Sequence, residues 1–203
     1  MKKGFTLVEL IVVVGIIALI ASLTLISFPS FRGRLSVDRE VGKIALALRK
    51  AQQYSGAVKR FNGETFTDGS FPAACGKLYF AQYPAYGLSI SMDSPNEYNI
   101  YADPDCDKHS ISYSGDLVEA ITLDPGINIQ DICLDIDSAI PTCGITKLDV
   151  WFVRPNPTLI LRINEEEANE LLQSAKIIIH SESGSQKSVI IRKTGQISVQ
   201  NEP

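Results

Sequence analysis

The chain has 203 residues, of which 45% are hydrophobic, and a formal net charge of −4 at pH 7. This length suits one globular domain with an accessory segment. The acidic balance argues against a protein that binds nucleic acid over its whole surface, but it does not exclude a local basic patch.

The chain begins with two basic residues and a long apolar segment. Lys2 and Lys3 precede a run from Leu10 to Phe28 that contains no charged side chain. As a helix, the segment 5–28 would be about 36 Å long, against about 30 Å of hydrocarbon in a bilayer. The lysines at its start predict that the N-terminus stays in the cytoplasm and that the rest of the chain lies outside.

Three interpretations of this segment differ in the residues they explain. An ordinary signal peptide has a shorter apolar core, of about 7–15 residues, followed by a small-residue cleavage site. A plain signal anchor explains the lysines and the length. It does not explain Glu9, because a carboxylate inside a membrane segment costs on the order of 3 kcal/mol. The third interpretation depends on the residues around Gly4.

The order Lys-Lys-Gly followed by Phe-Thr-Leu-Val-Glu-Leu resembles the leader and cleavage motif of type IV prepilins and type II secretion pseudopilins. The resemblance covers residues 1–28. It implies that a prepilin peptidase cuts between Gly4 and Phe5, and that the same enzyme methylates the amino group of Phe5. Glu9 then becomes the fifth residue of the mature chain and is expected to neutralise the Phe5 amine of a neighbouring subunit.

After the apolar segment, apolar residues recur at helical spacing in a predicted amphipathic helix that Gly56 ends. They are Val37, Val41, Ile44, Ala45 and Leu48. The pattern predicts that one helix of about 50 residues starts in the membrane and ends in the globular domain. The expected organisation is a cleaved leader at 1–4, a transmembrane helix at 5–29, its amphipathic continuation at 30–56 and a globular β-rich domain at 57–203.

Within the globular part, residues 57–85 are predicted to be rich in loops, and alternating residues further along predict strands. The expected strands are 86–91, 97–102, 117–123, 127–136, 148–153, 158–163, 175–181, 188–192 and 196–199. Asn164 is predicted to cap a short acidic helix at 165–173, with Glu167 at the capping-box position. This layout is α+β: a long N-terminal helix packed on a mostly antiparallel sheet.

Three later segments are similar to GspH/FimT-type minor pseudopilins: a hairpin at 86–103, a strand and turn at 152–155 and a strand pair at 188–197. The resemblance implies a pilin-like fold. It also implies three kinds of partner: prepilin peptidase/methyltransferase, other pilin or pseudopilin subunits and the membrane.

Four cysteines lie outside the apolar segment: Cys75, Cys106, Cys133 and Cys143. An even number of cysteines in an exported domain permits two disulfides, and four cysteines allow three pairings. Cys133–Cys143 would close a short loop and leave Cys75 to Cys106, but the sequence does not choose among the pairings. Zinc is disfavoured because no pair of cysteines has metal-binding spacing.

Asp103, Asp105 and Asp107 form a candidate calcium site, because hard cations prefer carboxylate oxygens. The spacing does not match an EF-hand: Lys108 and Ser114 stand where glycine and glutamate are needed. A solvated turn is the alternative.

Lys187, Arg192 and Lys193 form a candidate DNA contact, which the resemblance suggests because some minor pilins take part in DNA uptake. The alternative is a charged hairpin edge that resists aggregation. No catalytic motif is present, so neither enzyme activity nor a resident cofactor is expected.

The sequence thus predicts a structural subunit, either a minor pilin or a pseudopilin. It would be inserted in the cytoplasmic membrane, with its domain in the periplasm or outside the cell, and then added to a type IV pilus or type II secretion filament. Two alternatives stay open: a filament-tip module that binds DNA, a surface or a secreted substrate, and an anchored protein that never assembles.

Overall fold

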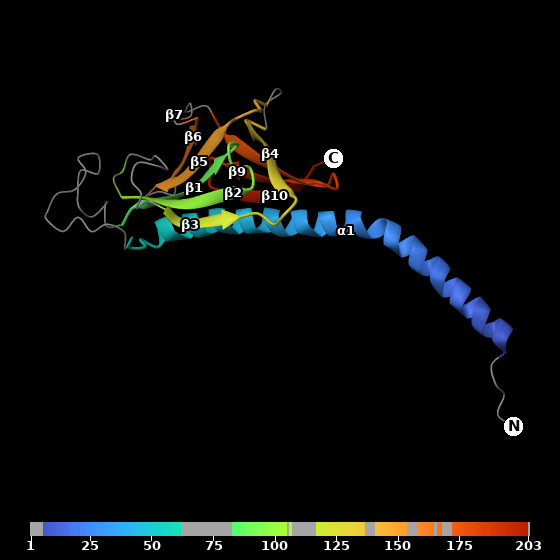
Figure 1. Cartoon of the computed structure of the whole chain (residues 1–203). Helices are drawn as coiled ribbons and strands as arrows, with labels where there is room; N and C mark the ends of the chain where they lie inside the picture. The colour runs from blue at the N-terminus through green and yellow to red at the C-terminus, as the bar shows by residue number, and fades with distance from the viewer. Residues whose placement is uncertain are drawn as a thin grey trace.

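The computed structural model describes residues 6–61, 83–104, 106, 117–136, 141–153, 158–164, 166–167 and 172–202, with the backbone alone at 23–30, 158 and 166–167. In these residues, one long helix precedes ten strands (Figure 1). The elements are α1 (Leu7–Gly56), β1 (Ala85–Ser91), β2 (Glu97–Asp103), β3 (Leu117–Thr122), β4 (Ile127–Leu134), β5 (Lys147–Val153), β6 (Thr158–Ile163), β7 (Glu166–Glu167), β8 (Ser174–Ser181), β9 (Gln186–Arg192) and β10 (Ile197–Asn201).

The helix α1 has two halves with different surroundings. Its C-terminal half runs along the strands, and its N-terminal half leaves the domain and changes direction (Figure 1). Pro29 lies between the two halves and has no N–H to donate within the helix, which favours a bend at this point. The 50 residues of α1 agree with the single long helix that the sequence predicts.

The strands form two antiparallel sheets. The first has the order β3-β2-β1-β5-β6-β7, and the second has the order β10-β9-β8-β4. The helix contacts β1 and β5 of the first sheet and β4, β8, β9 and β10 of the second. The predicted α+β arrangement is therefore confirmed, with the β domain divided into two sheets that share one helix.

The core lies between α1 and the two sheets. Val37, Val41, Ile44 and Leu48 are fully buried, and each is a residue whose spacing predicts the buried face of the helix. They join buried side chains of both sheets in one apolar cluster. Burial of a leucine, isoleucine or valine contributes about 1.5–3 kcal/mol, so this stripe fixes the helix to the domain.

The acidic helix predicted at 165–173 is wrong at residues 166–167, which form the strand β7 beside β6. Residues 165 and 168–171 lie outside the described part. Asn164 has a φ of 50°, in the left-handed region that asparagine tolerates better than most residues. Its side-chain oxygen accepts hydrogen bonds from the Lys147 N–H at 3.0 Å and the Thr146 hydroxyl at 2.6 Å. The asparagine therefore makes a sharp turn into a strand.

A small ion network fixes the helix to the loop after β3. Lys43 Nζ lies 2.7 Å from the Glu40 carboxylate and 3.3 Å from the Asp124 carboxylate, and Arg39 lies 3.0 Å from Asp124. Glu40 is fully buried, so the Lys43 partner is important for compensating its charge. The hydrogen bond to Glu40, which outweighs the opposing effect of burial, raises the pKa of Lys43.

Acid is expected to weaken this network through Asp124. Burial acts to raise the pKa of Asp124, but the hydrogen bond and charge of Lys43, with Glu40 and Arg39, hold that pKa below its usual value. A lowered pKa in the folded state contributes stability above the unfolded pKa, and this stability is lost as the pH falls below about 4. Asp124→Asn should therefore lower the melting temperature at pH 7 and have little effect at pH 3.

Thermal unfolding of both proteins between pH 3 and pH 7 checks this expectation. Asp93→Asn, in an exposed turn, is the matched control and should change the melting temperature little at any pH. A constant difference between wild type and Asp124→Asn over the whole range would contradict the account.

Candidate functional site

The N-terminus of α1 holds the predicted processing and assembly residues. Thr6 caps the helix from an extended conformation, and its hydroxyl accepts a hydrogen bond from the Glu9 N–H at 3.3 Å. The Glu9 carboxylate accepts in return from the Thr6 N–H at 3.4 Å. This reciprocal pair is a capping box, which satisfies two backbone donors that would otherwise lack helix partners.

The capping box gives Glu9 a local function that the sequence analysis did not assign to it. The signal was present, because threonine followed three residues later by glutamate before an apolar run is the pattern of a capping box. Gly4 and Phe5, the predicted cleavage and methylation positions, lie outside the described residues.

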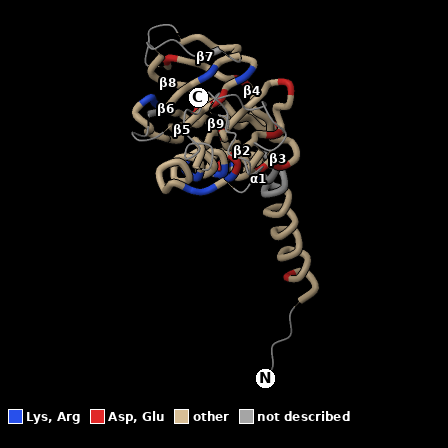
Figure 2. The backbone as a smooth tube through the Cα atoms, turned by 90° about the vertical axis from the view of Figure 1, so that its left-hand side faces the viewer, with Lys and Arg blue, Asp and Glu red and all other residues tan. Residues whose placement is uncertain are grey.

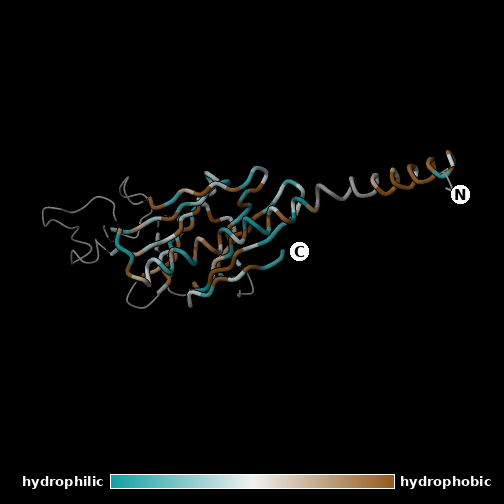
Figure 3. The backbone as a smooth tube through the Cα atoms, turned by 90° about the horizontal axis from the view of Figure 1, so that it is seen from below, coloured by the Kyte–Doolittle hydropathy of each residue, from teal (hydrophilic) through white to brown (hydrophobic). Residues whose placement is uncertain are grey.

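We call residues 7–22 the N-terminal arm, and its described side chains are almost entirely apolar. Within it the one charged residue is Glu9 (Figure 2). Residues of high hydropathy follow one another along the N-terminal part of the helix, whereas hydrophilic and hydrophobic residues alternate along the chain in the domain (Figure 3). The large apolar side chains of the arm are 46–74% exposed in the single chain, from Val13 to Leu7. An apolar surface of this extent is typical of a segment that is covered by lipid or by other protein.

Small residues interrupt the bulky side chains of the arm. Gly15, Ala18 and Ser22 are three and four residues apart and therefore share one helix face. A Cβ added at Gly15 would meet nothing within 4 Å. The Ser22 hydroxyl donates to the Leu19 carbonyl at 2.8 Å, so its polar hydrogen is already satisfied inside the helix. Such a face allows another helix to approach closely in an apolar environment.

Among the residues that the structure describes, no helical stretch is both long enough and apolar enough to cross a bilayer.

The structure contains the Cys133–Cys143 disulfide, with the two Cα atoms 4.0 Å apart. Cys106 is also disulfide-bonded, and Cys75 lies outside the described residues. The Asp131 carboxylate accepts a hydrogen bond from the Gly144 N–H at 2.9 Å, beside the bridge. Asp131 and the two sulfurs lie within 4.8 Å of one another. Sulfurs bonded to each other offer no thiolate to a metal. The disulfide and the Asp131 hydrogen bond therefore hold the two ends of the loop together.

The predicted calcium residues are described only in part. Asp103 is buried at the end of β2, and Asp105 and Asp107 lie outside the described residues.

The structure does not bring the three predicted DNA-contact residues together. Lys187 and Arg192 lie near opposite ends of β9, and an odd separation of five residues directs them to opposite faces of the strand. Lys193 follows Arg192. The Lys187 ammonium is paired with Asp38 on α1. A compact basic patch made from these three residues is therefore not formed.

A long helix that has an apolar, capped N-terminal arm and packs through its C-terminal half on antiparallel sheets is a pilin-like arrangement. Comparison with known proteins agrees with this class. Residues 1–25 match the family described as the prokaryotic N-terminal methylation motif. The chain is also 35% identical over 75 residues to a fimbrial protein of Moraxella nonliquefaciens, which covers 37% of this chain.

That similarity spans 46% of the fimbrial relative, so the chain matches less than half of its length. No solved structure matches this chain. The motif, the similarity to the fimbrial protein and the fold together support a likeness to the type IV pilin-like superfamily.

Proposed function

We propose that the protein is a minor pilin or pseudopilin, cleaved after Gly4, methylated at Phe5 and added to a type IV pilus or type II secretion filament. The observation that carries this proposal is the N-terminal arm. Its large apolar side chains are about half exposed or more, and Glu9 would be the fifth residue after the point of cleavage. A single chain leaves this surface uncovered, and a bundle with the apolar helices of neighbouring filament subunits would cover it.

Before assembly, the membrane is the proposed environment of the arm. The uncharged run from Leu10 to Phe28 and the methylation motif at 1–25 support this. Lys2 and Lys3 place the N-terminus on the cytoplasmic side, where the leader is removed. The domain then lies in the periplasm or outside the cell.

In the filament, cleavage gives each subunit a positive amine at Phe5 and a negative carboxylate at Glu9. Each charge is costly in an apolar surrounding, and the two are stabilised when they meet between subunits. The packing surface continues beyond the arm: Phe31, Leu35 and Leu46 lie on the exposed side of α1 and are 52–65% exposed. Neighbouring subunits would therefore contact both halves of the helix.

Mass spectrometry of the mature N-terminus tests the proposal. We expect the purified chain to begin with Phe5 and to carry one added methyl group. A Gly4→Leu variant should keep its first four residues, because the added side chain blocks close approach of the peptidase to the backbone, and it should be absent from filaments. A wild-type chain in filaments that still begins with Met1 would contradict the proposal.

The proposal includes the GspH/FimT-type subfamily. The segments of this chain that are similar to that subfamily fall in β1, β2, β5, β9 and β10 where the structure describes them. The proposal assigns the protein a structural function, without enzyme activity or a resident cofactor. Its partners are the peptidase that processes it and the other subunits of the filament.

A further inference from the structure

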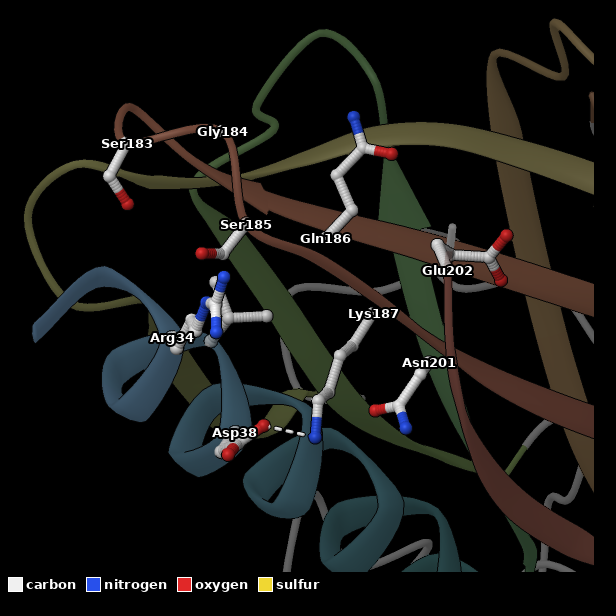
Figure 4. Close-up of a pocket in the computed structure, with 10 residues that line it drawn as sticks. Arg34, Asp38, Ser183, Gly184, Ser185, Gln186, Lys187, Asn201 and Glu202 are labelled. Atoms are coloured by element: carbon white, nitrogen blue, oxygen red, sulfur yellow. Dashed lines mark ion pairs between the residues drawn. The ribbon is translucent and has the colours of Figure 1, made fainter. Parts of the chain in front are cut away.

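A cavity of about 500 Å³ opens between α1, the β8–β9 turn and the C-terminal end of the chain (Figure 4). The helix contributes Arg34 and Asp38, the start of β9 contributes Lys187, and Glu202 follows β10. Figure 4 shows Arg34 rising from the helix toward the turn that carries Ser185. The cavity therefore joins three parts of the chain that are far apart in sequence.

The charges around this cavity are balanced except at Arg34. Lys187 is ion-paired with Asp38, so these two charges cancel. Glu202 is 3.2 Å from Lys176 Nζ and accepts a hydrogen bond from the Ser188 hydroxyl at 2.6 Å. Arg34 has no hydrogen-bond or ion-pair partner within the described part of the chain. The four charged residues that line the cavity sum to zero, but Lys176, outside the lining, neutralises Glu202, so Arg34 is the cation whose charge is not compensated by an ion pair. Its guanidinium offers a donor pair that suits phosphate.

The C-terminal end of the chain, which lines the cavity, lies at the end of the domain from which the helix departs (Figure 1). Gly33 permits the close contact that forms the wall of the cavity, because a Cβ at this position would lie 1.7 Å from the Ser183 hydroxyl oxygen. Ser185, on the same turn, adds a hydroxyl donor at the cavity wall.

The position of Arg34 along the helix matches the headgroup layer of a bilayer. Arg34 follows the exposed apolar residue Phe31 by three residues, which is about 4.5 Å of helix rise. Each headgroup region is about 5–8 Å thick outside the hydrocarbon. If the apolar segment occupies the hydrocarbon, the cavity is level with the lipid phosphates.

We propose that this cavity binds the phosphate of an anionic phospholipid headgroup while the subunit is in the membrane. The inference rests on the proposed membrane stage of the subunit. Arg34 would hold the phosphate and Ser185 would donate a further hydrogen bond. The bound lipid would orient the domain on the bilayer before the arm enters a filament.

Native mass spectrometry of the full chain released from nanodiscs tests the proposal, with phosphatidylcholine and phosphatidylglycerol as the two lipids. Wild type should retain phosphatidylglycerol in preference, and Arg34→Gln should retain about fivefold less of it. Asp38→Asn should retain more, because it releases Lys187 from its ion pair. Arg49→Gln, at an exposed position about four turns further along α1, is the matched control and should resemble wild type.

Two results would overturn the inference. Equal retention of phosphatidylglycerol by wild type and Arg34→Gln would show that Arg34 does not bind lipid. If this variant also lost filament incorporation, Arg34 would instead contact a neighbouring subunit. Displacement of phosphatidylglycerol by inorganic phosphate would show a site for free anions. Carbonate extraction of cell membranes separates this inference from the proposed function: a chain that leaves the membrane contradicts the membrane stage itself.

Discussion

Replacing Glu9 with glutamine is expected to leave the chain folded, inserted and cleaved, but to reduce its incorporation into filaments at least about tenfold. Glutamine at this position still completes the capping box with Thr6, so the start of the helix is preserved. The variant loses the negative charge that would meet the Phe5 amine of a neighbour. Two unit charges about 4 Å apart interact by about 4 kcal/mol at an effective dielectric constant of 20, more than the 1.4 kcal/mol of a tenfold effect.

A second variant separates charge from capping. Thr6→Val removes the capping hydroxyl and keeps Glu9 charged, so it should cost the helix about 1 kcal/mol and still enter filaments. The measurement is the fraction of mature chain found in sheared filaments, with the processed N-terminus checked by mass spectrometry. If Glu9→Gln assembled normally and Thr6→Val did not, the essential function of Glu9 would be capping.

The capping box changes how Glu9 is understood. The sequence alone explains its charge by a cationic partner on another subunit. In the single chain, the carboxylate already has a partner in the Thr6 N–H. The two functions are compatible, since a carboxylate accepts several hydrogen bonds. The cap holds the acidic group at the helix N-terminus, where an incoming amine can reach it.

Two similar sequence patterns in this chain have different outcomes. Thr6 and Glu9 form a capping box, and Asn164 and Glu167, at the same spacing, lie in a turn and a strand. Threonine is β-branched and rarely adopts a positive φ, whereas asparagine tolerates it. The N–H of Lys147, at the start of β5, donates a hydrogen bond to the Asn164 side chain and so stabilises the turn. Local spacing cannot reveal this competition, because the competing strand is distant in sequence.

The helix and most strand positions could be predicted because their signals are local. Val41, Ile44 and Leu48 repeat at the period of a helix, and β1 and β2 flank a clear turn. The division into two sheets could not be predicted, because it depends on the pairing of β1 with β5 and of β4 with β8. An alternating pattern determines which face of a strand is buried, but it does not identify the neighbouring strand.

The candidate sites show the same limit. The sequence allows three pairings of the four cysteines, and one of them joins Cys133 to Cys143 across a short loop. The structure contains this bridge. The basic residues Lys187 and Arg192 are close in sequence, yet a strand separates them in space. The Arg34 cavity could not have been found from sequence, since the helix, the β8–β9 turn and the chain end form it together.

Gly87→Ala is expected to destabilise the domain by overpacking the contact between β1 and β5. Gly87 pairs with Trp151 across β1 and β5, on the face of the sheet opposite the main core. A Cβ at Gly87 would lie 2.6 Å from both a Trp151 ring carbon and the Val150 carbonyl oxygen. The carbonyl belongs to the backbone of a paired strand and cannot move aside without breaking the pairing. Overpacking of this kind costs about 1–3 kcal/mol.

The matched control is Gly42→Ala, on the exposed side of α1, where an added Cβ meets nothing within 4 Å. Alanine in place of glycine inside a helix should stabilise it by about 0.5–1 kcal/mol, so the two substitutions are expected to have opposite signs. Thermal unfolding of the full chain in detergent measures both, with about 2–4 °C expected for each kcal/mol. Trp151 is the one tryptophan of the chain and is 1% exposed, so its fluorescence follows the region of the predicted clash. Gly87→Ala with a wild-type melting temperature would show that β1 and β5 are not packed as closely as the Gly87–Trp151 pairing requires.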